Sequence, residues 1–262
     1  MKTRLDAELV RRGLARSREA ATDLITAGNV LVSGMPASKA ATQVDAETSI
    51  TLKDDHAEFV SRGGHKLAGA LDKFTQIDVS GKTALDAGAS TGGFTDVLLK
   101  RGAKKVVAVD VGYGQLAWEL QKDERVKILD RVNVRNLTAA QVGEEIDLVV
   151  ADLSFISLKL VLPALISVAK EGADFLVMVK PQFEVGKEKL GAGGVVRDVH
   201  LRKEAVVAVA ESAFALTLGT LGVVASPLPG PSGNVEYFLW LRKGAPALLE
   251  VDLDLAIEKG PA

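Results

Sequence analysis

Five short apolar segments that alternate with helical patterns constrain the fold of this chain more than any other feature of its sequence. They are the expected strands Thr83–Asp86, Val106–Asp110, Val126–Asp130, Asp147–Asp152 and Phe175–Lys180. Helical spacing is found at Phe94–Arg101, Leu116–Gln121, Leu158–Lys170 and Leu201–Leu216. This alternation predicts a doubly wound α/β domain with a mostly parallel sheet. Two later strands, Val223–Ser226 and Tyr237–Arg242, are joined by a loop short enough for an antiparallel pair and bring the sheet to seven strands.

Residues 1–59 follow a different pattern and predict a small, separate α+β domain. A first helix is expected to start at a Thr3–Asp6 capping box, and a second helix is expected to be capped by Ser17. Strands at Val30–Val32 and Ser49–Leu52 follow these helices. Six basic and two acidic side chains lie in the first 18 residues, which fits either a solvated helix face or contact with phosphates.

A glycine pair marks the expected junction between the two domains. Residues 60–65 form the predicted linker, in which Gly63 and Gly64 are either a flexible hinge or a tight turn. Helical spacing resumes at Lys66, and residues 66–262 form the predicted α/β domain.

Composition excludes several classes of site and of protein. None of the 262 residues is cysteine, which excludes disulfides, iron–sulfur clusters, thiolate zinc and a cysteine nucleophile. The three histidines lie far apart in the sequence, so no metal site is expected. The net charge of −2 gives no overall attraction to polyanions. Residues 1–8 alternate in charge and the uncharged stretch 212–235 is broken by glycine and proline, so we expect a cytoplasmic protein with no signal peptide or membrane helix.

A glycine-rich loop after the first expected strand predicts a cofactor site. The loop reads Asp86-Ala87-Gly88-Ala89-Ser90-Thr91-Gly92-Gly93-Phe94, and small residues at the start of a helix let the backbone approach a ligand closely. A nicotinamide dinucleotide prefers G-x-G-x-x-G, whereas the pattern here is G-x-S-x-G-G after an acid. Asp86 would repel a pyrophosphate and attract a cation. S-adenosylmethionine carries an ammonium and a sulfonium and no phosphate, so it is favoured over the dinucleotide.

Aspartates at the ends of neighbouring strands extend this site, because ligands of doubly wound sheets bind outside the carboxyl ends of the strands. Asp110, 22 residues past Gly88, can accept both ribose hydroxyls of the cofactor, and Asp130 can reach its adenine amino group. The expected cofactor-binding residues are Asp86, Gly88, Ser90, Gly92, Gly93, Phe94, Asp110, Asp130 and Asp152.

The methyl acceptor is predicted from residues near the ends of the later strands. Enzymes that methylate amino groups of nucleic acids usually carry Asn/Asp-Pro-Pro-Tyr/Phe where this chain has Asp152-Leu153-Ser154-Phe155. Carbon methylation through a thiolate is excluded by the lack of cysteine. Lys180 and Glu236 fit activation of a hydroxyl, with Lys180 either as a neutral base or as a donor to the forming alkoxide, and with Lys66 as a second cation. These three groups and Asp152 would titrate as one coupled set.

Five stretches of the sequence resemble a known family. They are 85–95 (LDAGASTGGFT), 109–116 (VDVGYGQL), 151–158 (ADLSFISL), 179–184 (VKPQFE) and 229–236 (PGPSGNVE). Through them the chain resembles the TlyA family over nearly its whole length. The resemblance implies a ribosomal RNA cytidine 2′-O-methyltransferase, with a class I, Rossmann-like domain similar to the FtsJ-type 2′-O-methyltransferases and an N-terminal αL RNA-binding domain of the S4 type. The FtsJ-type Lys-Asp-Lys-Glu tetrad falls on Lys66, Asp152, Lys180 and Glu236.

The resemblance also implies partners and RNA contacts. S-adenosylmethionine is the implied donor, and assembled ribosomal subunits are the implied substrates, with one cytidine in 16S and one in 23S rRNA because the N-terminal domain is complete. The implied RNA contacts, each of which could equally be a solvated cation, are Arg4, Arg18, Lys39, Arg62, Arg131, Arg135 and Lys187. Neither DNA nor a membrane is an expected partner, and a monomer is expected. The alternatives are a non-catalytic RNA-binding assembly factor and a membrane-active hemolysin, after the family's older label.

Overall fold

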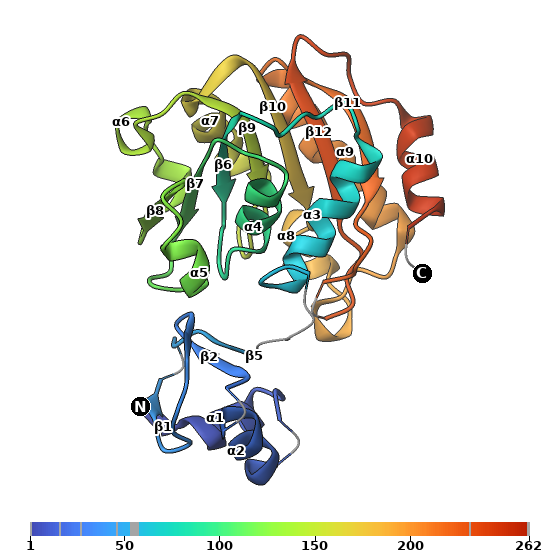
Figure 1. Cartoon of the computed structure of the whole chain (residues 1–262). Helices are drawn as coiled ribbons and strands as arrows, with labels where there is room; N and C mark the ends of the chain where they lie inside the picture. The colour runs from blue at the N-terminus through green and yellow to red at the C-terminus, as the bar shows by residue number, and fades with distance from the viewer. Residues whose placement is uncertain are drawn as a thin grey trace.

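Most of the chain forms a domain built on a seven-stranded sheet, and a small α+β unit precedes this domain (Figure 1). The computed structural model describes residues 2–15, 17–26, 28–45, 47–52, 58–230 and 232–260. Arg16 of the basic N-terminal segment and Pro231 of the last motif therefore lie outside the described residues.

The sheet has the strand order β8-β7-β6-β9-β10-β12-β11. Its strands are β6 (Thr83–Ala87), β7 (Lys105–Asp110), β8 (Val126–Asp130), β9 (Ile146–Ala151), β10 (Ala169–Val179), β11 (Leu218–Ala225) and β12 (Tyr237–Lys243). Strand β12 runs antiparallel to both of its neighbours, β10 and β11, while the pairs from β8 to β10 are parallel. The predicted doubly wound, mostly parallel sheet of seven strands, with an antiparallel pair at its end, is confirmed.

Helices cover both faces of the sheet. They are α3 (Arg62–Lys73), α4 (Gly93–Lys100), α5 (Trp118–Gln121), α6 (Ala139–Val142), α7 (Leu158–Val168), α8 (Pro181–Glu184), α9 (Val199–Ala215) and α10 (Glu250–Glu258), with short 3-10 turns at Val134–Asn136, Lys187–Lys189 and Ala192–Gly194. Successive strand residues point to opposite faces, so Leu148 of β9 packs in the core under α3 and α4 and Val149 packs in the core under α7 and α9.

The N-terminal unit has its own small core of Leu5, Leu9, Ala21, Ile25 and Val30 with their neighbours. Its helices are α1 (Leu5–Arg11) and α2 (Arg18–Thr26); β2 (Val30–Val32) pairs with β3 (Met35–Pro36) and β5 (Ile50–Leu52), and β1 (Thr3–Arg4) pairs with β4 (Gln43–Val44). The turn between β2 and β3 contacts the sheet domain, where the Gly34 carbonyl accepts a hydrogen bond from the Trp118 amide at 3.3 Å.

The predicted capping box at Thr3 and Asp6 is wrong, whereas the Ser17 cap is confirmed. Thr3 lies in strand β1, and α1 begins after Arg4 without a side-chain cap. The reason is that the Asp6 carboxylate is taken by the guanidinium groups of Arg4 and Arg18. Ser17 Oγ accepts a hydrogen bond from the Ala20 amide at 3.1 Å, as predicted.

The glycine pair Gly63-Gly64 is part of a helix and is neither a hinge nor an isolated turn. Both residues lie in the first turn of α3, which begins at Arg62. A Cβ on Gly64 would lie 2.4 Å from Phe59 Cβ, and a Cβ on Gly93 of α4 would lie 2.7 Å from the Gly64 nitrogen. The glycines therefore let the start of α3 pack closely against α4 and against the segment before it.

Further differences from the sequence prediction concern the bounds of one strand and the presence of one helix. Helix α7 ends at Val168. Strand β10 begins at Ala169 and therefore earlier than the predicted strand at Phe175, because the exposed residues 170–172 also belong to the strand. Helix α10 was not predicted, since its apolar residues Leu253 and Ala256 form only a short pattern.

In the part of the chain that the structure describes, no helix combines the length and apolarity needed to cross a membrane.

Candidate active site

Two lysines and two acids from four separate elements meet at the carboxyl edge of the sheet. Lys180 directly follows β10 and Glu236 directly precedes β12, and the antiparallel register that pairs Val179 with Tyr237 brings them to adjacent strand ends. Asp152 directly follows β9, the parallel neighbour of β10. Lys66 reaches this edge from α3.

The four groups form two short ion pairs. Lys66 Nζ lies 2.5 Å from Glu236 Oε2, and Lys180 Nζ lies 2.5 Å from Asp152 Oδ1. The Lys66 and Glu236 side chains are 9% and 1% exposed, so this pair is largely buried. Lys180 is also buried, whereas the Asp152 side chain is 23% exposed and opens into a cavity.

Ser154 belongs to this cluster although sequence reasoning gave it no role. Lys180 Nζ donates a hydrogen bond of 3.0 Å to Ser154 Oγ. The Lys180 ammonium is therefore held by an ion pair with Asp152 and a hydrogen bond to Ser154. The only signal in the sequence was the position of Ser154 two residues past Asp152.

The glycine loop approaches the cluster so closely that a side chain would not fit. Gly88 has a φ of +87°, and a Cβ there would lie 2.6 Å from the Asp152 carbonyl oxygen. Ser90 also has a positive φ, and its amide donates a hydrogen bond of 2.8 Å to Asp110 Oδ2. The loop is thus fixed to strand-end residues on either side of β6.

Two cavities that share part of their lining follow the glycine loop. A cavity of about 290 Å³ is lined on the lysine side by Lys66, Lys180, Ser61, Arg62, Gly93 and Phe94, and one of about 510 Å³ is lined on the other side by Asp110, Val111, Gln115, Asn133, Val134 and Phe155. Gly88, Ser90, Asp152 and Ser154 line both. An elongated ligand could therefore lie along the loop with one end at Asp110 and the other at Lys180.

Three of the predicted cofactor residues lie outside the linings of these cavities. Asp130 Oδ2 accepts a hydrogen bond from the Gly114 amide at 2.9 Å, and Asn133 lines the cavity where Asp130 was predicted. A Cβ on Gly92 would meet the side chains of Leu116 and Leu120 rather than the cavity. Asp86 lies beneath the loop and is fully buried.

Asp86 carries an unsatisfied oxygen that fits a cationic ligand. Thr95 Oγ1 donates a hydrogen bond of 2.7 Å to Asp86 Oδ2, while Asp86 Oδ1 has no hydrogen-bond partner among the described residues. Burial is the main cause that raises the pKa of Asp86 to about 7; the carboxylates of Asp152 and Asp110 add to this rise, and the Thr95 hydrogen bond opposes it. A positive group bound nearby would favour the ionised form of this carboxyl.

The raised pKa of Asp86 predicts a pH dependence of stability. The unfolded pKa is about 3.9, so between about pH 4 and pH 7 the folded protein holds a proton that the unfolded chain releases. Asp86 therefore makes the free energy of unfolding fall as pH rises through this window, by up to about 1.4 kcal/mol per unit. In Asp86→Asn this contribution is absent. Urea unfolding of both proteins from pH 4 to pH 8 measures the difference, and equal slopes for the two proteins would contradict the prediction.

An exposed aromatic side chain stands beside the cluster and was not predicted as a site residue. Phe155 is 92% exposed, has a φ of +63°, and lies with its ring 5.2 Å from that of Phe183. An apolar ring held in solvent by a strained backbone is typical of a contact with a partner molecule. Exposure of this kind depends on the tertiary structure, so sequence reasoning missed it.

The predicted RNA contacts are all exposed, but the structure brings only some of them near the site. Arg62 lines the smaller cavity, and the Arg131 guanidinium lies 4.3 Å from the centre of the Tyr113 ring. Arg4 and Arg18 both bind the buried Asp6, at 3.0 and 2.8 Å, and the Arg4 hydrogen bond is the main cause that holds the pKa of Asp6 far below its usual range. The remaining residues, Lys39, Arg135 and Lys187, are solvent-exposed.

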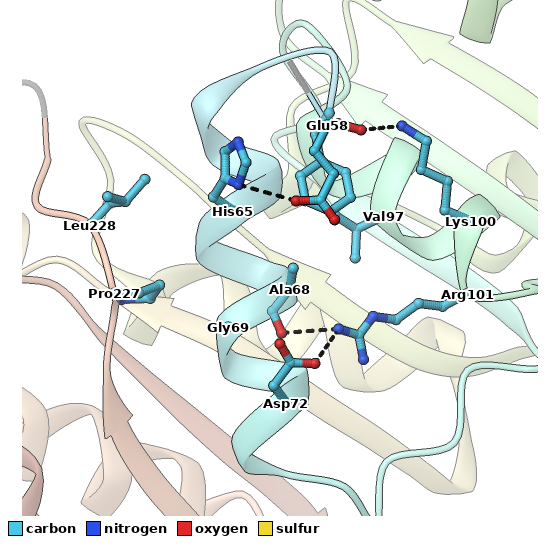
Figure 2. A pocket seen from close by; sticks show the side chains of 11 residues that line it. Glu58, His65, Ala68, Gly69, Asp72, Val97, Lys100, Arg101, Pro227 and Leu228 are labelled. Atoms are coloured by element: carbon cyan, nitrogen blue, oxygen red, sulfur yellow. Dashed lines mark hydrogen bonds and ion pairs between the residues drawn. The ribbon is translucent and has the colours of Figure 1, made fainter. Parts of the chain in front are cut away.

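A larger cavity, of about 790 Å³, lies on the outer side of α3 and contains none of the predicted site residues (Figure 2). Several of its charged groups are paired with one another: Arg101 binds Asp72 at 2.6 Å, and His65 Nδ1 lies 3.8 Å from Glu58 Oε2. We therefore assign the candidate active site to the two cavities along the glycine loop.

Comparison with known proteins identifies the family of this chain. The chain matches the FtsJ-like methyltransferase family over residues 59–243 and the S4 domain over residues 3–50. It is 58% identical to the 16S/23S rRNA (cytidine-2′-O)-methyltransferase TlyA of Mycobacterium tuberculosis, with 99% of each chain covered, and 36% identical to hemolysin A of Brachyspira hyodysenteriae, with 89% and 97% covered. A solved structure from Streptococcus thermophilus, described as a hemolysin, is 36% identical with a TM-score of 0.77 and covers 98% of this chain and 95% of its own.

Proposed function

Because the chain belongs to the family of FtsJ-like methyltransferases that carry an S4 domain and include TlyA, we propose that it methylates the ribose 2′-hydroxyl of cytidine in ribosomal RNA. The observation that supports this most is the convergence of Lys66, Asp152 and Lys180 on one cavity that opens onto the glycine loop. Residues 1–59 would bind RNA and residues 66–262 would carry out the transfer.

S-adenosylmethionine, the proposed donor, supplies a methyl group made electrophilic by its sulfonium. The residues along the loop fit this molecule: Gly88 leaves room for it, Asp110 can accept the ribose hydroxyls, and the unsatisfied Asp86 Oδ1 favours a cation. Asn133, which lines the adenosine end of the proposed site, is better placed than Asp130 to contact the base.

Lys180 is the proposed catalytic residue. Its ammonium donates one hydrogen bond to Ser154 and forms an ion pair with Asp152, which leaves a hydrogen for the acceptor 2′-oxygen. A positioned donor at that oxygen stabilises the negative charge that develops as the hydroxyl loses its proton. The carboxylate of Asp152, which faces the cavity, can accept that proton.

Phe155 is the proposed platform for the acceptor base. Its exposed ring lies one residue past Ser154, so a base stacked on it would hold the attached ribose close to Lys180. Stacking of a base on an aromatic ring contributes about 1–3 kcal/mol, without requiring a particular sequence.

We further propose one target cytidine in each ribosomal subunit, and the cytoplasm as the place of action. The S4 domain is matched over residues 3–50, and the relative named for both 16S and 23S rRNA aligns with 99% of this chain. Ribosomal subunits are cytoplasmic in bacteria, which supports the proposed location.

The decisive experiment incubates the purified protein with ribosomal subunits from a strain that lacks it, in the presence of methyl-labelled S-adenosylmethionine. We expect label on a cytidine ribose in both 16S and 23S rRNA, mapped by resistance of the adjacent bond to alkaline cleavage. Label in one subunit only would overturn the two-target proposal. Binding of subunits without any label would favour the non-catalytic assembly factor.

Lys39 offers a clean test of RNA binding by the N-terminal domain. Its side chain is exposed and has no hydrogen bond or ion pair to the described residues, so Lys39→Ala is expected to leave the free energy of unfolding unchanged. Loss of one phosphate contact should weaken RNA binding and reduce the slope of log K against log salt concentration by about 1. Filter binding at several salt concentrations measures this. An unchanged slope would remove Lys39 from the interface.

A further inference from the structure

A buried carboxylate on α8 holds the far end of the loop that carries the acceptor platform. Glu184 Oε2 accepts a hydrogen bond of 2.6 Å from Ser157 Oγ, and Glu184 Oε1 accepts one of 2.7 Å from the Leu158 amide. The Glu184 side chain is 1% exposed. Both oxygens of this carboxylate thus accept from the last residue of the loop 152–157 and from the first residue of α7, and Lys159 Nζ lies 4.0 Å from Glu184 Oε2.

The same loop is fixed at its beginning by the residue that starts the α8 segment. Lys180 binds Asp152 and Ser154, while Phe183 contacts the ring of Phe155. The short segment 180–184 therefore contacts the loop along its whole length, and Phe155 stands between the two anchored ends. With a φ of +63°, Phe155 depends on its surroundings to keep this backbone conformation.

Capping of α7 alone does not explain Glu184. Ser157 already caps this helix, because its Oγ accepts a hydrogen bond of 3.3 Å from the Lys159 amide. Burying a carboxylate is costly unless it is paired and hydrogen-bonded, and an exposed cap would stabilise the helix without any burial cost. What Glu184 adds is a link between the helix start and the segment that holds Lys180.

We propose that Glu184 is a positioning residue for methyl transfer, which keeps Phe155 and Ser154 in place against Lys180 by anchoring Ser157 and Leu158. The proposal rests on the function proposed above, in which Phe155 receives the acceptor base. Glu184 acts by accepting and directing hydrogen bonds. A glutamine can meet the same two partners, because its oxygen can accept from Leu158 and its amide can donate to Ser157.

The variants Glu184→Ala and Glu184→Gln separate positioning from a merely structural role. We expect Glu184→Ala to lower the single-turnover rate on saturating ribosomal subunits by about 10²-fold, since small misplacements of reacting groups have effects of this size. Glu184→Gln should retain a rate close to that of the parent protein. Glu171→Ala, which removes an exposed glutamate of β10, is the matched control and should leave the rate unchanged. All rates are measured at a temperature at which circular dichroism shows each variant folded.

A double-mutant cycle with Phe155→Ala tests the route of the effect. If Glu184 acts through the loop, Glu184→Ala has a much smaller effect in the Phe155→Ala background than alone. Equal effects in both backgrounds, or a folded Glu184→Gln variant as slow as Glu184→Ala, would overturn the proposal.

Fluorine NMR of protein labelled with fluorophenylalanine supplies a readout without RNA. The Phe155 resonance, assigned by its loss in Phe155→Leu, should shift or broaden in Glu184→Ala and not in Glu184→Gln. An unchanged resonance in Glu184→Ala overturns the positioning role whatever the substrate is. The resonance could change in Glu184→Ala although the parent protein does not methylate ribosomal RNA. That pair of results would contradict the proposed function and would still support the anchoring of the loop by Glu184.

Discussion

Lys180→Ala is expected to reduce methyl transfer by roughly 10³-fold while cofactor and RNA binding persist. The substitution removes the donor aimed at the acceptor oxygen, and it leaves Gly88 and Asp110 in the cavity of about 510 Å³ untouched. Single-turnover rates with saturating subunits measure the chemical step, and calorimetric titration with S-adenosylmethionine measures cofactor binding. The expected pattern is a lost rate with retained affinity.

Two controls sharpen this experiment. Lys170→Ala removes an exposed lysine that pairs with Asp147 at 2.8 Å, away from the cavities, and should leave the rate unchanged. Lys180→Arg keeps the charge but replaces a compact ammonium by a planar guanidinium, so we expect it to remain slow. A full rate in Lys180→Ala would remove this residue from the mechanism.

Glu236→Leu is expected to lower the free energy of unfolding by about 3–5 kcal/mol, because it leaves the buried Lys66 ammonium without its partner. The pair is 2.5 Å apart and almost wholly sealed from solvent. The double variant Lys66→Met/Glu236→Leu removes both charges and should recover most of the lost stability. Urea unfolding of the parent protein, both single variants and the double variant measures this.

The same variants separate stability from catalysis. We expect the double variant to be folded and yet inactive, since Lys66 lines the cavity next to Lys180. A double variant as unstable as Glu236→Leu would show that the ion pair is not the cause of the loss. A double variant with full activity would show that the pair serves the fold alone.

Much of the sheet and of the site could be predicted because the relevant signals are local. Apolar runs identified each parallel strand, and a polar residue at the end of a parallel strand must lie at the carboxyl edge, which brought Asp152 and Lys180 together. Asp130 shows the limit of this reasoning. It also ends a strand, but its side chain turns to the Gly114 amide, and only the tertiary structure determines which strand-end side chains face the cavity.

The features that were missed depend on packing between distant segments. Gly63-Gly64 has the composition of a hinge, and its role in close helix packing appears only once Phe59 and Gly93 are seen against it. Asp6 has the spacing of a capping box, but two arginines compete for its carboxylate, and one of them, Arg18, comes from another helix. Exposure of Phe155 is likewise a property of the folded loop.

Because β12 lies between β10 and β11 in the sheet, the active site can form only after all three strands have been synthesised. Lys66 and Glu236 are 170 positions apart, and Glu236 comes into place only when β12 pairs with strands made before it. The S4 domain of a growing polypeptide can thus be synthesised well before the catalytic cluster, which is complete only after β12 has left the exit tunnel. Fragments released too soon would hold nucleic acid without modifying it.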